Sequence, residues 1–185
     1  QGYRPGALAA RSFGADALAR RHPGIVVGSL SAYGEVGPWA GRRGFDSLVQ
    51  TCTGLNLAEA AAADSAVPRA LPMQALDYAA GHLLAFGIQA ALWRQRTQGG
   101  SWQVQVTLAG VAAWLRTLGQ DSAGLSAQPP VADHWMDETP CGFGPPGTGG
   151  QAVLRAMRHA AWLSVTPPHW RHPSMPPGSH PPAWP

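Results

Sequence analysis

The sequence predicts an α/β fold, and three segments carry that prediction. Ile25–Leu30 is a short run of apolar, mostly β-branched residues between turn signals, which is typical of a buried parallel strand. Ala75–Gly100 is a long apolar stretch of helical character, and in Trp102–Leu108 apolar residues alternate with polar ones as they do in a strand. With a further helical pattern over Ala109–Leu118, the order strand, helix, strand, helix indicates an α/β protein.

The long helix expected over 75–100 has clear signals at both ends. Asp77 near its start and Arg94 and Arg96 near its end complement the helix dipole, and Gly99-Gly100 terminates it. Because the helix is apolar most of the way round, we expect it to be buried on several sides. Polar residues interrupt the apolar run, so we interpret it as a core helix and not as a membrane span.

Shorter elements fill the chain before this helix. After a loop at 1–6, we expect two short helices, Ala7–Arg11 and Ala15–Arg21. The first predicted strand is followed by a loop rich in glycine and proline, Ser31–Gly41. A helix over Phe45–Thr53, ended by Gly54, and a helical stretch over Asn56–Leu71 that frays into a loop come next. The loop at 31–41 follows the carboxyl end of the first predicted strand. Ligands bind at this edge of open α/β sheets, so we expect a site there.

The composition changes after the predicted α/β region, which covers residues 1–120. Glycine and proline accumulate over 121–150, which we interpret as a linker. Residues 151–185 are expected to form a helix, Gln151–Ser164, and a proline-rich tail that lies extended over a surface.

The composition also limits the kinds of binding partner that we expect. Only 12% of the 185 residues are charged, which suggests a surface covered by a partner or by more chain. A net charge of +3 is too small to indicate nucleic acid, and neither a membrane span nor a signal peptide is visible. The two cysteines and the histidines match no metal-ligand spacing, so we expect no metal and a reducing, cytoplasmic location. The chain opens on Gln1 inside what reads as a motif, so we expect it to be a fragment lacking its N-terminal segment.

Asp77 can be explained in two ways from its position. An aspartate at the start of a helix is often a cap, which has no catalytic role. The same position also suits a nucleophile, because helix N–H groups favour the ionised carboxylate, and a carboxylate can attack an activated acyl carbon. The residues around it allow both roles.

Four landmarks, taken together, resemble the family III CoA-transferases, which include formyl-CoA, carnitine and bile-acid CoA-transferases. They are Tyr3-Arg4-Pro5-Gly6, then SAYGEVGPWAGRRGFD at 31–46, then Leu76-Asp77 at the head of the long helix, then RQRTQGGSWQVQVTL at 94–108. The resemblance covers residues 1–118 and implies a partial Rossmann-like fold of that family. It also implies that coenzyme A is a cosubstrate, with an acyl-CoA and a carboxylic acid as substrates. The partner it implies is a second copy in an interlocked homodimer, or a complementing chain.

The resemblance assigns roles to four residues. Asp77 matches the nucleophile, which forms an acyl–aspartyl anhydride and then an aspartyl-CoA thioester. Asp46 matches an acidic residue lining the active site, Tyr3 an aromatic residue near CoA, and Arg43 a basic residue at the CoA site. The residues alone favour a different interpretation, in which Arg43 is a solvated loop charge and Asp46 a helix cap.

The residue at position 45 distinguishes the CoA-transferases from a related group of racemases. The related α-methylacyl-CoA racemases carry a catalytic histidine where this chain has Phe45, and phenylalanine cannot exchange a proton. Transfer is therefore the leading hypothesis, and a 2-methylacyl-CoA racemase is a minor alternative. Gly2, Ala10 and Ala32 depart from the family pattern. Gly2 and Ala10, with the expected loss of the N-terminal segment and the low charge content, motivate a competing hypothesis, a non-catalytic remnant or partner subunit. A third hypothesis is one half of a split or duplicated enzyme.

Overall fold

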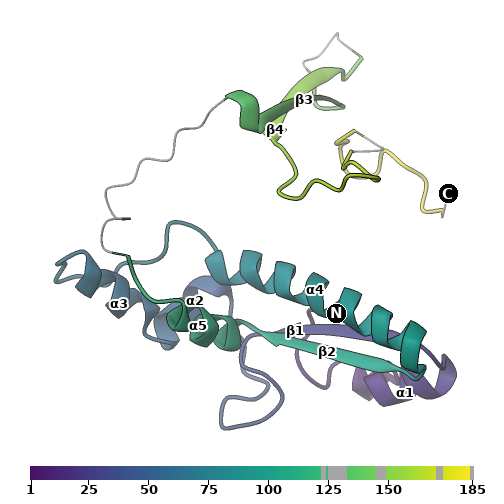
Figure 1. Ribbon diagram of the computed structural model, residues 1–185, viewed down its shortest axis with the longest axis horizontal. Helices are drawn as coiled ribbons and strands as arrows, with labels where there is room; N and C mark the ends of the chain where they lie inside the picture. The colour runs from purple at the N-terminus through teal and green to yellow at the C-terminus, as the bar shows by residue number, and fades with distance from the viewer. Residues whose placement is uncertain (122–123, 125–132, 145–148, 170–172, 184–185) are drawn as a thin grey trace. The chain divides into compact units, whose positions relative to one another are not determined.

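The computed structural model describes residues 1–121, 124, 133–144, 149–169 and 173–183 (Figure 1). The chain divides into two compact units, Gln1–Ser126 and Ala127–Pro185. Each unit is described below by itself.

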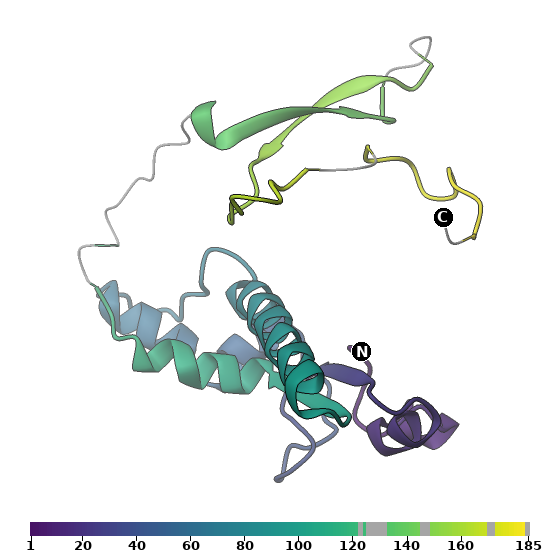
Figure 2. The ribbon, with the colours of Figure 1, turned by 45° about the vertical axis from the view of Figure 1, so that its right-hand side comes forward.

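The centre of the first unit is a parallel strand–helix–strand arrangement. Strands β1 (Val26–Ser31) and β2 (Trp102–Thr107) pair in parallel, from Val26 opposite Trp102 to Ser31 opposite Thr107. The connecting helix α4 (Ala75–Gln98) packs along both strands (Figures 1 and 2). Because α4 runs back against the strand direction, its amino end lies at the carboxyl ends of the strands.

Helix α4 is longer than the strands it covers. Its 24 residues span about 36 Å, whereas each six-residue strand spans about 20 Å. Its first turns therefore extend past the sheet. There they pack against two short helices, α2 (Asp46–Cys52) and α5 (Leu108–Thr117), and a third, α3 (Leu55–Ala62), packs against α2. Two further helical elements, η1 (Ala9–Arg11) and α1 (Ala15–Arg21), precede β1.

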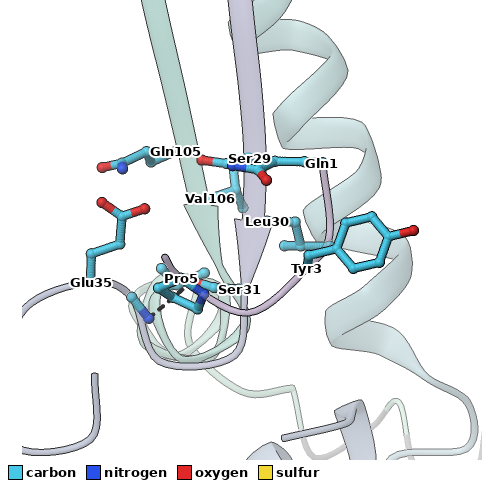
Figure 3. Close-up of a pocket in the computed structure, with 11 residues that line it drawn as sticks. Gln1, Tyr3, Pro5, Ser29, Leu30, Ser31, Glu35, Gln105 and Val106 are labelled. Carbon is cyan, nitrogen blue, oxygen red and sulfur yellow. Dashed lines mark hydrogen bonds between the residues drawn. The ribbon is translucent and has the colours of Figure 1, made fainter. Parts of the chain in front are cut away.

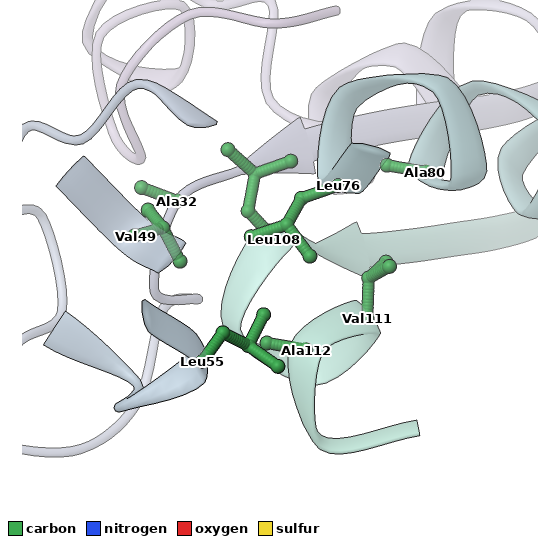
Figure 4. Close-up of a cluster of buried hydrophobic side chains, with 8 residues drawn as sticks. All are labelled: Ala32, Val49, Leu55, Leu76, Ala80, Leu108, Val111 and Ala112. Atoms are coloured by element: carbon green, nitrogen blue, oxygen red, sulfur yellow. The ribbon is translucent and has the colours of Figure 1, made fainter. Parts of the chain in front are cut away.

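The hydrophobic core lies at this meeting point. Eight buried side chains from α2, α3, α4, α5 and the residue after β1 form one cluster (Figure 4): Ala32, Val49, Leu55, Leu76, Ala80, Leu108, Val111 and Ala112. Val49, Leu76 and Ala112 have no solvent exposure. The core thus fixes α2 against the amino end of α4, and these two elements carry Asp46 and Asp77.

Two glycines set how closely α4 approaches the sheet. A Cβ atom added at Gly87 of α4 would lie 2.6 Å from Cγ1 of Val104 in β2. One added at Gly28 of β1 would lie 2.7 Å from Cδ1 of Ile88 in α4. The helix and the sheet therefore interlock without room for another methyl group at Gly87.

The predicted burial of α4 on several sides is wrong within this unit. Leu76, Ala80 and Ala91 are buried, but Phe86 and Trp93 are 72% and 71% exposed. The reason is the width of the sheet, since two strands cover only one side of a helix. None of the helices in the described parts of the chain is both long and apolar enough to cross a membrane.

The second unit is built on a β-hairpin. Strands β3 (Met136–Cys141) and β4 (Ala152–Met157) pair antiparallel, from Met136 opposite Met157 to Cys141 opposite Ala152. A single 3-10 turn, η3 (Asp133–Trp135), precedes β3. The side chain of Arg158 pairs with Asp137 at 2.8 Å, across the strand ends.

This hairpin corrects two predictions. The helix predicted over Gln151–Ser164 is wrong, because its first half forms β4, and the stretch at 121–150 interpreted as a linker contains β3. Alanine, leucine, arginine and methionine favour helices in isolation, but the cross-strand hydrogen bonds to β3 override that preference.

The close approach of α4 to the sheet predicts opposite effects for the same substitution at two glycines of one helix. Gly87→Ala should lower the free energy of unfolding by about 1–3 kcal/mol, because the new methyl group overlaps Val104. Gly81→Ala should raise it by up to about 1 kcal/mol, because nothing lies within 4 Å of that Cβ position and alanine favours the helix. Chemical denaturation followed by circular dichroism measures both values, and equal effects would contradict the interlocked packing.

Candidate functional site

The candidate site lies where the amino end of α4 meets the carboxyl ends of β1 and β2. This is the edge at which ligands bind in open α/β sheets. Figure 3 shows a crevice at this edge, lined by Tyr3, Ser29, Ser31, Glu35 and Gln105 among others. The loop after β1 begins here, as the sequence predicts, and contributes Glu35.

The two predicted catalytic aspartates are in direct contact. The backbone N–H of Asp77 donates a hydrogen bond of 2.9 Å to Oδ2 of Asp46. Asp46 is the first residue of α2 and is only 1% exposed. It lies 31 positions before Asp77 in the chain. The fold therefore brings together two carboxylates that the sequence analysis assigned separately.

Asp46 has a structural role at the start of α4. The residue at the N-cap of α4, Gln74, makes no side-chain hydrogen bond to the free N–H groups of the first turn. Asp46 supplies the missing acceptor from another helix. Asp46 does not cap its own helix α2, whose N-cap residue is Phe45. It caps the first turn of α4 instead.

A third residue completes the contact, and the sequence analysis did not single it out. The side-chain amide of Gln50, in the next turn of α2, donates to Oδ1 of Asp46. The signal that could have found it is the spacing, because Asp and Gln four residues apart on a helix commonly hydrogen-bond. Gln50 is 2% exposed, which is rare for glutamine.

Asp77 itself is exposed and occupies the third position of α4, so it is not the N-cap residue. It lines an open depression with Gln74, Tyr78, Gly81 and His82, which share one face of the helix. Partial burial raises the pKa of Asp77 above its ordinary value of 3.8, and the negative charge of Asp46 raises it further. Asp77 therefore presents an accessible carboxylate on a backbone that is held by Asp46. Partial burial and the charge of Asp46 make this carboxylate more basic.

The two predicted CoA-binding residues lie elsewhere in the first unit. Tyr3 is 68% exposed and lines the crevice of Figure 3, with its ring turned away from Glu35 and Gln105. Arg43 is exposed in the segment before α2. Tyr3 therefore lines a different depression from Asp77. In the part of the chain that the structure describes, no three His, Cys, Asp or Glu side chains gather as metal ligands would.

Comparison with known proteins decides the family. The family model for CoA-transferase family III matches residues 1–133. The chain belongs to CoA-transferase family III. This confirms the resemblance and the α/β fold class that the sequence predicts.

Individual relatives agree with this assignment. The chain is 33% identical over 116 residues to a probable fatty acyl-CoA transferase of Mycobacterium tuberculosis, covering 63% of this chain and 29% of the relative. An acetyl-CoA:oxalate CoA-transferase of Acetobacter aceti is 29% identical over 102 residues, covering 55% of this chain and 26% of the relative. The chain therefore spans less than a third of the length of these family III proteins.

Solved structures show the same fold. A crystal structure of the Mycobacterium tuberculosis protein matches with a TM-score of 0.57 and 32% identity, over 63% of this chain and 33% of that one. A CAIB/BAIF family protein of Brucella suis matches with a TM-score of 0.56 at 21% identity, over 70% and 34% of the two chains. The second likeness concerns the fold alone.

The negative charge of Asp46, close to Asp77, predicts how the pKa of Asp77 responds to a substitution at position 46. Asp46→Asn removes the negative charge that raises the pKa of Asp77, so that pKa should fall. A pH titration of the Asp77 carboxyl carbon by NMR measures the change. Asp16→Asn, which removes an exposed charge from α1, is the matched control and should leave the pKa of Asp77 as it is. A pKa of Asp77 that is the same in Asp46→Asn and wild type would show that Asp46 does not act on it.

Proposed function

We propose that this chain takes part in the transfer of CoA between an acyl-CoA and a carboxylic acid, with Asp77 as the acyl acceptor. The observation that carries the proposal is the geometry of Asp77: an exposed carboxylate in the first turn of α4, beside an open depression, anchored through its N–H to the buried Asp46. Membership of CoA-transferase family III and relatives named for acyl-CoA substrates support the same chemistry.

The proposed reaction begins with Asp77 as a nucleophile. One of its carboxylate oxygens attacks the thioester carbonyl of the acyl-CoA, the C–S bond breaks, and CoA leaves as the thiolate. The product on the protein is an acyl–aspartyl anhydride. The thiolate then attacks the side-chain carbonyl of Asp77, the original acid leaves as a carboxylate, and an aspartyl-CoA thioester remains.

The second half of the reaction returns Asp77 to its starting state. The acceptor carboxylate attacks the aspartyl thioester and displaces the CoA thiolate, and the resulting anhydride is opened by that thiolate at the acceptor's carbonyl. The products are the new acyl-CoA and the free carboxylate of Asp77. The raised pKa of Asp77 suits this cycle, because a more basic carboxylate is a better nucleophile once ionised.

Three residues have proposed roles around this centre. Asp46 holds the backbone of Asp77, which is a positioning role and explains its burial. Tyr3 and Arg43 are proposed to contact CoA, since an exposed aromatic ring can stack on the adenine and a guanidinium can pair with phosphate. The free thiols of Cys52 and Cys141 fit a reducing compartment such as the cytoplasm.

We also propose that a second polypeptide, either another copy of this chain or a complementing chain, covers the outer face of α4. Tyr78, Phe86 and Trp93 are 61%, 72% and 71% exposed along this helix. A run of exposed aromatic side chains this long is typical of a surface that another protein covers. The same face includes the depression beside Asp77, so this partner would also enclose the substrates.

A covalent adduct on Asp77 is the direct test of the transferase proposal. Incubation with acetyl-CoA should add mass to the chain, and peptide mapping should place the adduct on Asp77, because both intermediates are covalent. Asp77→Asn should abolish labelling, whereas Glu59→Gln, on α3, should leave it unchanged. The absence of any adduct, with other acyl-CoAs and beside a candidate partner chain, would favour a non-catalytic remnant or partner subunit instead.

Racemisation should not occur. Phe45 is 84% exposed next to Asp46, and its ring has no proton to exchange where a racemase needs a base. In deuterated water, a 2-methylacyl-CoA incubated with the chain should therefore gain no deuterium at its α-carbon, as measured by mass spectrometry. Deuterium gain above that of a sample without protein would revive the racemase alternative.

A further inference from the structure

Gln50 is the most completely engaged buried polar side chain near the candidate site. Its amide nitrogen donates to Oδ1 of Asp46 and, at 3.2 Å, to the carbonyl oxygen of Met73. Its amide oxygen accepts from the N–H of Leu71 at 3.0 Å. With 2% exposure, the side chain has no access to bulk water, so these three bonds satisfy it within the protein.

These bonds join three parts of the first unit. Gln50 and Asp46 belong to α2, while Leu71 and Met73 belong to the segment that leads into α4. The same carboxylate of Asp46 that accepts from Gln50 through Oδ1 accepts from the N–H of Asp77 through Oδ2. A continuous chain of hydrogen bonds therefore runs from the segment before α4, through Gln50 and Asp46, to the backbone of Asp77.

The chain of bonds has a fixed direction. If the amide of Gln50 were turned over, its oxygen would face the Oδ1 of Asp46, and its NH₂ group would face the N–H of Leu71. Two acceptors would then face each other, and so would two donors, so only one orientation satisfies every group. With Oδ1 held in this way, the carboxylate of Asp46 presents Oδ2 to the N–H of Asp77.

The surrounding core leaves this arrangement little freedom. Val49, the neighbour of Gln50 in α2, and Leu76, the neighbour of Asp77 in α4, are both fully buried in the same hydrophobic cluster (Figure 4). Because Gln50 and Asp46 are 2% and 1% exposed, bulk water does not reach the bond between them, and an unpaired buried carboxylate oxygen is costly.

We infer that Gln50 is a positioning residue for the nucleophile, which it orients through Asp46 without touching the substrate. This inference rests on the proposed role of Asp77 as the acyl acceptor. It adds a requirement that the two aspartates do not specify by themselves: position 50 must offer a hydrogen-bond donor to position 46 and an acceptor to the N–H of Leu71.

The requirement can be tested by reversing the polarity of one bond. In Gln50→Glu, the side chain keeps its shape and its acceptor for Leu71 but loses the donor, so two carboxylates face each other. In the double variant Asp46→Asn/Gln50→Glu, the new amide at position 46 can donate to the new carboxylate at position 50 and still offer its oxygen to the N–H of Asp77. The double variant therefore restores the chain of bonds from Leu71 to Asp77, with donor and acceptor exchanged between positions 46 and 50, and lacks only the bond to the carbonyl of Met73.

Two measurements on the full chain separate this inference from the proposed function. The first is the hydrogen-exchange rate of the Asp77 amide by NMR, which needs no substrate. The second is the rate of covalent labelling of Asp77 by acetyl-CoA. Gln95→Glu is the matched control, because the amide of Gln95 donates to the carbonyl of Gly24 at 3.2 Å from the far half of the same helix.

We expect Gln50→Glu to accelerate exchange of the Asp77 amide at least tenfold and to slow labelling at least tenfold. The double variant should return both rates to within about threefold of wild type, and Gln95→Glu should stay within twofold. A double variant no better than Gln50→Glu would overturn the inference, and so would a wild-type exchange rate in Gln50→Glu. If Gln50→Glu does not fold, restored folding and Asp77 protection in the double variant support the inference, and failure of both variants overturns it.

The two proposals can fail separately. If wild-type chain is never labelled but the Asp77 amide follows the expected pattern of exchange, the transferase proposal fails and the positioning role of Gln50 stands as an orientation of Asp77 alone. If labelling occurs and does not respond to Gln50→Glu, Asp77 is the acyl acceptor and Gln50 does not position it.

Discussion

The buried carboxylate of Asp46 constrains the whole first unit. A charge with 1% exposure needs strong hydrogen-bond donors, and its donors come from two different elements, the side chain of Gln50 on α2 and the backbone of Asp77 on α4. The bonds form only if α2 lies against the start of α4, which is where the hydrophobic core gathers. Polar and apolar contacts therefore specify the same arrangement, and that arrangement sets the position of Asp77.

The local pattern of the sequence predicts the bounds of these helices and strands well, but it does not predict what packs against them. Helix α1 has the predicted bounds, β1 and β2 lie within a residue of the predicted strands, and α4 begins at the predicted residue. Periodicity and terminal signals depend on neighbouring residues, so they can be read locally. The same patterns do not say what covers an apolar face, which is why the burial of α4 was overestimated.

Contacts between distant residues account for the other differences. Asp46 and Asp77 were each assigned from position and resemblance, but nothing local predicts that one carboxylate binds the other's backbone 31 residues away. The strand β4 was missed for a similar reason, since its pairing with β3 decides its conformation. Gln50 was missed because a glutamine in a short helix is usually exposed, and only the fold shows that this one is buried.

The unequal lengths of α4 and its strands have a consequence for motion at the site. The middle of α4 is locked against Val104 at Gly87, whereas its first turns extend past the sheet and depend on α2 and the core for support. A helix end fraying into solvent loses order from its terminus inwards, and Asp77 is only the third residue. The bond from its N–H to Asp46 thus opposes fraying in the first turn, where a loosened backbone would let the Asp77 carboxylate point in many directions. Local melting of this single turn would displace Asp77 while the core around α2 and α5 and the strands stayed folded.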